Sequence, residues 1–494
     1  MSLTMLDALF ALKKRKFDFG IAQKPRVDVP DETIVKGFDA LCDEMLFNLM
    51  PPVGGFSTPW VRPAPKFPGA YLWDSSFIAM AWKIWDPGIA MSILTPFIDF
   101  QAIDGRMPHM VFWGKIVSKL SNPPFLEWAL DQALAWQPNL EAAKKFLEPC
   151  RRFITWRYEN RFNKEHGLYF WIDSYESGID NSPRFRSVDE KEDYGTKHLG
   201  AIDLNAEMAL EQASMLRIMD RLGVNDGRKS IEKGVDETRG AIETRLWDPK
   251  DCLFYDRDIR TGRLIPMDTI ASYFPLILDG LNPTMVDKLV GRLSDPRKYN
   301  TLVPLPTVAR DAPEFIKDMW RGPVWINTAY LVINGLKQQG HGDLAGDMAY
   351  RLCKGVFETW QKEGSFYEFY DPDRHDLQEL SRKKGNLYKQ ITLGSKPVKH
   401  FAGWTALANA LLVEDVIGLQ KDGDAWCIEP HLPRSWIDQG KAIHVVMPFF
   451  KTRLDILPKK GTDTLDCTLD VDGIQRHASV GNGKRAALED TGAS

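Results

Sequence analysis

The chain has 494 residues, of which 44% are hydrophobic and 26% are charged, as in ordinary globular proteins of one large domain or several smaller ones. Its formal net charge of −4 gives no electrostatic basis for nucleic acid or an anionic membrane as the main partner. Its 16 tryptophans can line a groove as well as fill a core, which is compatible with a carbohydrate ligand stacked on aromatic rings.

The cysteines and the first residues bear on the cellular compartment. Six cysteines lie far apart without a Cys-x-x-Cys pair, so we expect reduced thiols and no zinc or redox site. The basic residues 13–16 follow the short apolar run 3–12, which is the reverse of a secretory signal. Since no run approaches the ~18 apolar residues of a membrane span, we expect a cytoplasmic protein without a membrane partner.

Helical patterns dominate from about residue 31 to residue 420. Asp31 can cap the first helix, whose apolar residues recur at helical spacing. A fixed repeat of roughly 34–47 residues, as in helical solenoids, is not visible. About a dozen helices in one run therefore predict an all-α (α/α)6 barrel. The predicted helices cover residues 31–46, 75–85, 87–100, 125–136, 139–162, 203–222, 226–245, 267–279, 284–293, 322–338, 342–362 and 402–419.

The pattern changes after the last predicted helix. Residues 442–447 and 464–471 are typical of short strands. We therefore expect a small C-terminal β appendage over residues 421–494, packed on the barrel. The barrel itself is expected to span residues 31–420, and residues 1–30 form an N-terminal extension.

A cluster of polar residues follows a glycine turn in the segment 176–184. It contains Asp180, Asn181 and Arg184, and it comes just after an aromatic run that ends at Trp171. A carboxyl group beside aromatic rings is suited to protonate the oxygen of a glycosidic bond. Glu176 in the same segment is a rival carboxylate.

A second carboxylate lies among aromatic residues in the segment 366–372. Glu368 follows Tyr367 there, and Glu363 is its nearest rival. Two separated carboxylates are what glycoside hydrolysis requires, one as the acid and one as the base.

Two earlier motifs can contribute polar groups to a sugar site. Asp74 follows Trp73; it can cap the next helix or hold adjacent sugar hydroxyls. The loop 100–110 contains Gln101, Arg106 and His109, although a loop between helices needs no function.

Later motifs supply tryptophans and positive charge. Trp320, Arg321 and Trp325 surround a Gly-Pro break at a helix start, and Trp404 opens the last predicted helix. The segment 371–399 is strongly basic, which is typical of a solvated loop; the alternative is a flexible lid that contacts an anionic part of the substrate.

Taken in order, these motifs resemble glycoside hydrolase family 63, whose plan the family 37 trehalases share. The Ser-Gly-Ile-Asp-Asn-Ser-Pro-Arg form of residues 177–184 looks most like the bacterial mannosylglycerate and glucosylglycerate hydrolases. The resemblance covers roughly residues 30–440. It implies inversion of configuration, no organic cofactor, Asp180 as the general acid and Glu368 as the general base.

The predicted function is an inverting α-glycosidase that hydrolyses a small α-glucoside or α-mannoside, such as glucosylglycerate, mannosylglycerate or an α-linked disaccharide. The alternatives are a trehalase-like enzyme and a non-catalytic carbohydrate-binding protein on the same barrel. A homo-oligomer is possible, since aromatic residues on the outer helices could form a contact between subunits. The residues expected to bind substrate are Trp73, Asp74, Gln101, Arg106, His109, Trp171, Asn181, Arg184, Trp320, Arg321, Trp325, Tyr367 and Trp404.

Overall fold

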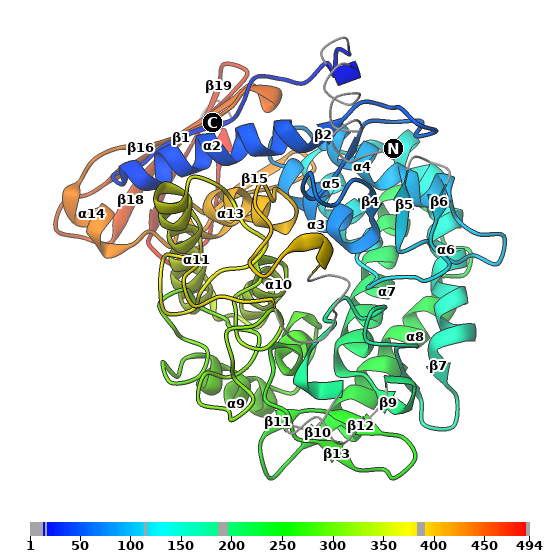
Figure 1. Ribbon diagram of the computed structural model, residues 1–494. Coiled ribbons are helices and arrows are strands. Elements are labelled where there is room, and N and C mark those ends of the chain that lie inside the picture. The colour runs from blue at the N-terminus through cyan, green and yellow to red at the C-terminus, as the bar shows by residue number, and fades with distance from the viewer. Residues whose placement is uncertain (1–12, 15–16, 113–115, 186–195, 383–390, 491–494) are drawn as a thin grey trace.

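The computed structural model describes residues 13–14, 17–112, 116–185, 196–382 and 391–490. Helices form most of the body, and a strand-rich region lies against one side of it (Figure 1). Among the described helices, none is both long enough and apolar enough to cross a membrane.

The helices agree closely with the amphipathic runs of the sequence. The main helices are α2 (Glu32–Asn48), α3 (Leu72–Trp82), α4 (Pro87–Asp99), α5 (Leu126–Trp136), α6 (Leu140–Arg161), α7 (Ile202–Leu222), α8 (Arg228–Ala241), α9 (Pro283–Leu293), α10 (Ile326–Gln338) and α11 (Gly342–Glu363). Three short segments, η5 (Trp404–Ala406), α13 (Leu407–Leu411) and η6 (Leu412–Val416), form the last predicted helix. Shorter helical pieces are η1 (Pro183–Phe185), η2 (Thr196–His198), η3 (Ile242–Leu246), η7 (Pro448–Phe450) and α14 (Arg434–Gln439).

Three predicted helices differ from the structure. The run at 75–85 is α3, which begins at Leu72 after Tyr71, so Asp74 lies in its first turn and does not cap it. The run at 267–279 forms a 3₁₀ helix, η4 (Ile270–Ile277), because Pro275 inside it lacks the backbone N–H that an α-helix requires. The run at 322–338 becomes helical only at Ile326, since Gly322 has a φ of +141° and the backbone is extended at Trp325.

Capping residues fix several helix ends. Asp31 accepts hydrogen bonds from the backbone N–H groups of Thr33 (3.1 Å) and Ile34 (3.4 Å), as its position predicts. At the other end, α7 and α11 stop at Gly223 and Gly364, whose positive φ angles of 66° and 71° are readily adopted by glycine.

The helices are arranged in two layers. The segments α3, α5, α7, η4, α10 and α13 contact one another in this order, and α13 contacts α3 in turn, so the inner segments form a closed ring. Outside it, α4 packs on α3, α6 and α8 pack on α7, α11 packs on α10, and α2 packs on α11. The burial agrees, because every residue of α3 is buried whereas α8 buries only Thr238 and Ala241.

A six-stranded antiparallel sheet lies against the helices. Its order is β1 (Arg26–Asp28), β16 (Ile443–Met447), β17 (Thr452–Pro458), β18 (Thr464–Val471), β19 (Ile474–Gly481) and β21 (Glu489–Asp490). Buried and partly exposed residues alternate along β16, as expected when one face of a sheet packs on helices. β1 pairs Val27 with Val445, so the N-terminal segment contributes an edge strand to the predicted C-terminal β region.

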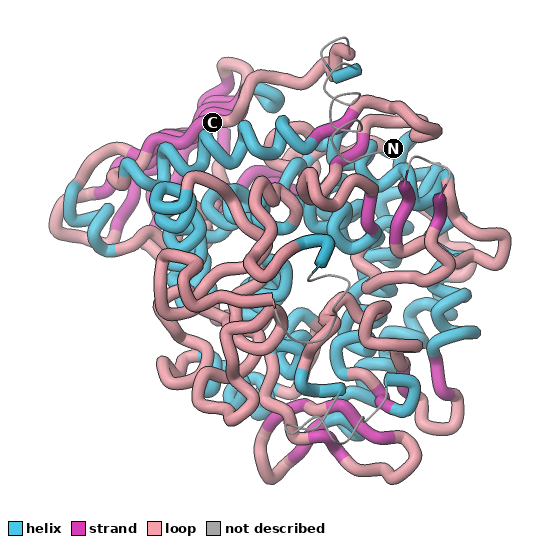
Figure 2. The backbone as a smooth tube through the Cα atoms, in the orientation of Figure 1, coloured by secondary structure: helices cyan, strands magenta, loops and turns pink. Residues whose placement is uncertain are grey.

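Further short strands connect the helices, so the prediction of an all-α body misses part of the architecture. The short strands are β2 (Leu49–Met50), β3 (Trp60–Val61), β4 (Ala70–Tyr71), β5 (Met110–Phe112), β6 (Ile116–Val117), β7 (Phe162–Asn163), β8 (Leu168–Tyr169), β9 (Leu199–Gly200), β10 (Trp247–Asp248), β11 (Leu253–Phe254), β12 (Asp256–Asp258), β13 (Leu264–Ile265), β14 (Leu419–Asp422), β15 (Ala425–Ile428) and β20 (Ala486–Ala487). Those from β9 to β13 gather at the end of the molecule opposite the large sheet (Figure 2).

Candidate active site

A cavity of about 500 Å³ lies where the inner helical segments begin. Trp73 is in the first turn of α3, Trp325 is the residue before α10, and Trp404 begins η5. The helix N-termini therefore surround it and provide a partial positive potential. The described residues that line it are Lys66, Phe67, Pro68, Tyr71, Trp73, Asp74, His109, Asn122, Tyr175, Gly178, Asp180, Met319, Trp320, Trp325, Glu368, Arg382, Thr392, Leu393, Phe401 and Trp404.

Asp180 and Glu368, which are far apart in the sequence, both line this cavity. Asp180 follows a turn in which Gly178 has a φ of +72°. A Cβ atom at Gly178 would come within 2.6 Å of Cζ2 of Trp73, so the turn lies directly on the indole ring. Close packing of the turn on Trp73 thereby sets the position of the half-buried Asp180.

Glu368 is buried and is held from two sides. Its Oε2 accepts a hydrogen bond from the Arg382 guanidinium and a weaker one from the backbone N–H of Val398 (3.4 Å). Its backbone carbonyl accepts a hydrogen bond from Nε1 of Trp404 (2.8 Å). The carboxylate is therefore fixed through both its side chain and its main chain.

Arg382 is a site residue that sequence reasoning missed. It belongs to the basic segment 371–399, where it looked like one of many solvated cations. In the structure its side chain is only 1% exposed and lies 5.5 Å from the centre of the Phe369 ring. Backbone hydrogen bonds to the Lys317 carbonyl (2.9 Å) and the Ser395 carbonyl (2.9 Å) hold Ser381 and Arg382 in place.

The predicted tryptophans form one wall of the cavity. Trp320 stacks on Trp325 with ring centres 3.6 Å apart and an interplanar angle of 13°. Trp73 lies 5.8 Å from Trp320 and 5.6 Å from Trp404. An apolar wall of this kind is suited to the C–H face of a sugar ring.

The lining also contains polar residues. Asp74 and His109 are both more than 90% buried, and the His109 ring packs 5.1 Å from Tyr175 and 5.8 Å from Tyr71. Neither tyrosine was predicted as a site residue, although Tyr71 directly precedes the Leu-Trp-Asp motif. Asp74 and His109 lie where the sequence predicted them.

Asn181 lies behind the cavity and joins its two halves. Its Oδ1 accepts a hydrogen bond from the backbone N–H of Trp320 (3.0 Å), and its Nδ2 donates one to the carbonyl of Asp318 (3.2 Å). It is not among the described lining residues. Its bonds tie the Asp180 turn to the Trp320 wall, which is a positioning role.

Gln101 and Arg106 are also absent from the described lining. Nε2 of Gln101 donates to the carbonyls of Gly105 and Pro149, both at 2.8 Å. Nη1 of Arg106 donates to the carbonyls of Ser118 (2.8 Å) and Leu120 (3.2 Å). Both side chains hold the loop that leads to His109.

Trp171 and Arg184 belong to a buried charge cluster outside the described lining. Arg184 pairs with Asp203 and with Asp256 (3.0 Å), and Nε1 of Trp171 donates to Asp203 (3.0 Å). Burial raises the pKa of Asp256 to about 6, although the Arg184 guanidinium opposes this shift. The cluster follows the Asp180 turn and anchors it to the start of α7.

Glu176, the rival of Asp180, is likewise outside the described lining. Nε and Nη2 of Arg161 donate to its two carboxylate oxygens, both at 2.8 Å. Burial alone raises the pKa of Glu176, but Arg161 and Arg157 outweigh burial and hold it below its usual value. Glu176 also accepts a hydrogen bond from the N–H of Ile172 (3.0 Å), so its contacts hold its own loop.

The remaining predicted residues lie next to the lining. Tyr367 donates from its hydroxyl to the carbonyl of Glu363 (3.4 Å), and its own carbonyl accepts from Thr405 (2.7 Å). Arg321 is buried, and its carbonyl accepts from the N–H of Ile316 (2.6 Å). Glu363, the rival of Glu368, is exposed at the end of α11.

The described part of the basic segment is held by internal contacts. Nζ of Lys396 donates to the carbonyls of Leu377 (3.0 Å), Gln378 (2.8 Å) and Leu380 (2.8 Å). Lys383, Lys384 and Lys389 lie outside the described residues, so the lid hypothesis stays a prediction. Within the described ranges, no group of three His, Cys, Asp or Glu residues is placed to hold a metal ion.

Comparisons with known proteins identify the family of this chain. The model of the mannosylglycerate hydrolase MGH1-like glycoside hydrolase domain matches residues 67–388. The mannosylglycerate hydrolase of Thermus thermophilus is 25% identical over 381 residues, covering 62% of this chain and 89% of the relative. Mannosylglycerate hydrolase MGH1 of Selaginella moellendorffii is 25% identical over 397 residues, covering 65% and 78%.

Solved structures support the fold. A family 63 mannosylglycerate hydrolase of Thermus thermophilus in complex with glucose has a TM-score of 0.62 at 22% identity, covering 76% of this chain and 99% of that one. Neutral trehalase of Saccharomyces cerevisiae has a TM-score of 0.54 at 15% identity, covering 72% and 74%. The resemblance seen in the motifs thus extends over most of the chain. The chain belongs to the mannosylglycerate hydrolase MGH1-like branch of glycoside hydrolase family 63 and is a glycoside hydrolase.

Proposed function

We propose that this chain is an inverting α-glycosidase that hydrolyses a small α-glucoside or α-mannoside in the cytoplasm. The observation that carries the proposal is that Asp180 and Glu368 line one cavity together with a wall of tryptophans. We further propose that the inner ring and its outer helices are the two layers of an (α/α)6 barrel over residues 31–420.

In the proposed mechanism, Asp180 is the general acid and protonates the oxygen of the leaving group. Glu368 is the general base and takes a proton from a water that attacks the opposite face of the sugar. Among the described residues, Oε1 of Glu368 has no hydrogen-bond partner, whereas Oε2 is held by Arg382. Oε1 is thus the oxygen available to the water. An inverting enzyme needs roughly 6.5–9.5 Å between its carboxyl groups to admit that water.

The other lining residues are assigned to substrate binding. Trp73, Trp320, Trp325 and Trp404 would pack on the sugar ring, and Asp74 would accept hydrogen bonds from its hydroxyls. A carboxylate can accept from two neighbouring hydroxyls at once, which fixes the orientation of the ring. Since a pure binding protein has no use for two catalytic carboxylates, we favour an enzyme over a non-catalytic relative.

We place mannosylglycerate and glucosylglycerate first among the substrates. Several relatives are named for mannosylglycerate hydrolysis, and others for glucosidase activity. Lys66 lies at the cavity and donates to the carbonyl of Leu393 (2.7 Å), which leaves two of its N–H groups for an anionic leaving group. A trehalase-like activity is the second candidate, because the fold is also shared with a trehalase.

The test is hydrolysis of mannosylglycerate, glucosylglycerate, trehalose, kojibiose and nigerose, with NMR detection of the anomer released first. We expect one of them to release the β-sugar first, and Asp180→Asn and Glu368→Gln to abolish turnover. Glu363→Gln is the matched control, since Glu363 is exposed and outside the described lining. Release of the α-anomer first would exclude inversion, and turnover by either catalytic variant would exclude the assigned residue.

A further inference from the structure

A second cavity, of about 610 Å³, lies at the other end of the inner helices. Trp325, just before α10, lines the catalytic cavity, whereas Asn334 and Lys337 near the end of α10 line the second one. The 13 residues of α10 span roughly 20 Å, so the two cavities are separate. Its described lining is Trp128, Asp131, Gln132, Ala135, Ala209, Leu210, Ala213, Arg217, Arg221, Val235, Arg239, Ile277, Leu278, Asp279, Asn334, Lys337, Gln338, Gln420, Asp422, Glu429 and Arg485.

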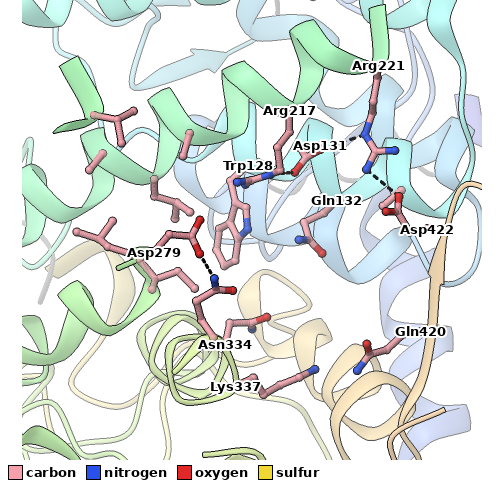
Figure 3. A pocket seen from close by; sticks show the side chains of 18 of the residues that line it. Trp128, Asp131, Gln132, Arg217, Arg221, Asp279, Asn334, Lys337, Gln420 and Asp422 are labelled. Carbon is pink, nitrogen blue, oxygen red and sulfur yellow. Dashed lines mark hydrogen bonds and ion pairs between the residues drawn. The ribbon is translucent and has the colours of Figure 1, made fainter. Parts of the chain in front are cut away.

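The described lining holds four carboxylates: Asp131, Asp279, Asp422 and Glu429. Glu429 is half-buried, with His431 at 3.6 Å and Arg485 at 3.8 Å. Both oxygens of the buried Asp131 are occupied, one by Nε of Arg217 (2.6 Å) and the other by Nε of Arg221 (3.2 Å) (Figure 3). Arg221 also pairs with Asp422 (2.9 Å), which is exposed, as is Asp279. Asp131, the buried carboxylate of this lining, is therefore neutralised, and the lining holds five arginines and lysines against four carboxylates.

Hydrogen-bond donors, in contrast, remain available. Nη1 of Arg217 and Nη1 of Arg221 have no acceptor among the described residues. Lys337 pairs with Asp415, a residue that is not part of the described lining, and this bond uses one of its three N–H groups. The lining thus combines several cationic donors with few free acceptors.

Amide side chains add neutral hydrogen-bonding groups. Oε1 of Gln132 accepts from Nζ of Lys83 (2.7 Å), so its NH₂ group is the end that remains for a ligand. Nδ2 of Asn334 donates to the carbonyl of Tyr330 (2.8 Å), which leaves its Oδ1 as an acceptor. Gln420 lies across the cavity from Gln132, on the same side as Lys337 (Figure 3).

A purely structural explanation covers only part of these observations. Arg221, Arg239 and Lys337 are in the last turns of α7, α8 and α10, where cations compensate the helix dipoles. Such compensation needs no hollow beside the helix ends. The space exists because small residues face it from α5 and α7, namely Ala135, Ala209 and Ala213.

We propose that this second cavity binds a small polyhydroxylated oxyanion, a sugar acid or a sugar phosphate. The free arginine and lysine N–H groups fit the charged oxygens, and the amides fit the hydroxyls. The volume lies within the roughly 300–1,000 Å³ of small-molecule sites. The site does not depend on the catalytic assignment.

The test is calorimetric titration of the full-length protein with gluconate, glucose 6-phosphate and glucose. We expect one or both anions to bind saturably and at least about tenfold more tightly than glucose. Arg217→Ala and Gln420→Ala should each weaken that binding about tenfold. Binding of gluconate alone identifies a carboxylate site, and binding of glucose 6-phosphate alone identifies a phosphate site.

Two matched controls locate the binding. Asp74→Asn alters the catalytic cavity, and Arg228→Ala removes an arginine of α8 that pairs with Asp220 and is not in the described lining. Both variants should bind as the wild type does. Loss of binding in Asp74→Asn, unchanged binding in both Arg217→Ala and Gln420→Ala, or no saturation up to about 10 mM would each overturn the proposal.

Discussion

Replacing Arg382 tests how the proposed base is held. Arg382 is buried, and its ion pair with Glu368 is the strongest contact of that carboxylate. Arg382→Ala removes a hydrogen bond to a charged group, an interaction worth roughly 1.5–3 kcal/mol. If that energy is lost in the transition state, kcat/KM falls by about 10- to 150-fold. Arg382→Lys keeps the positive charge but not the planar guanidinium group, so kcat/KM should fall less in this variant than in Arg382→Ala.

Chemical rescue separates positioning from a general structural effect. Added guanidinium should partly restore the rate of Arg382→Ala, because it can take the place of the missing side chain beside Glu368. Arg374→Ala is the matched control, because this arginine of the same segment pairs with Asp376 and is outside the described lining of the cavity.

The outcome that would refute this reasoning is also defined. Removal of one partner of a buried ion pair costs roughly 3–5 kcal/mol of stability, so Tm must be measured beside the kinetics. A variant that is folded at the assay temperature and keeps the wild-type kcat/KM would show that Arg382 does not support Glu368.

Three further predictions concern the surroundings of the site. Gly178→Ala should lower kcat/KM by about tenfold, because a Cβ at a φ of +72° costs roughly 1–3 kcal/mol and meets Trp73. The measurement is steady-state kinetics, and an unchanged kcat/KM would show that the turn can move. Arg161→Ala should lower the free energy of unfolding by roughly 3–5 kcal/mol in urea titrations, since Glu176 is left buried without its main partner. A loss below about 1 kcal/mol would contradict the assigned ion pair. Asp376→Asn should cost about 1 kcal/mol at pH 7, because hydrogen bonds from Arg374 hold the pKa of Asp376 far below its usual value. A pKa that is lower in the folded state than the unfolded value of about 3.9 stabilises the folded protein at pH values above about 3.9. The difference in the free energy of unfolding between wild type and Asp376→Asn should therefore shrink as the pH falls from about 4 towards 2. A constant difference would exclude an electrostatic origin.

The helices and the two carboxylates could be predicted because their signals are local. Apolar spacing and caps such as Asp31 act over a few residues, and they placed most helix ends correctly. Asp180 and Glu368 were found because each belongs to a recognisable motif, and the cavity brings both together. Their catalytic roles remain predictions.

The residues that sequence reasoning misplaced depend on distant partners. Arg184 and Arg382 are both arginines near a catalytic motif, yet Arg184 is paired with Asp203 and Asp256 outside the described lining, whereas Arg382 enters the cavity. Nothing within a few residues of either distinguishes them. The pairing of Val27 with Val445 could not be predicted from the sequence either, because the partner of a strand depends on the tertiary fold and not on adjacent residues.

The closed ring of inner helices has a consequence for biosynthesis. The contact between α13 and α3 joins residues near the end of the chain to residues near its start. Likewise, β1 can form its strand pair only after β16 has been synthesised. A ribosome releases the chain from the N-terminus, so α3 to α10 must emerge before the ring can close. During that interval the Trp73 face and the unpaired edge of β1 are exposed to other chains. We expect nascent chains of this protein to depend on chaperones until the last helices have been made, and truncation before α13 to give aggregation instead of a smaller active enzyme.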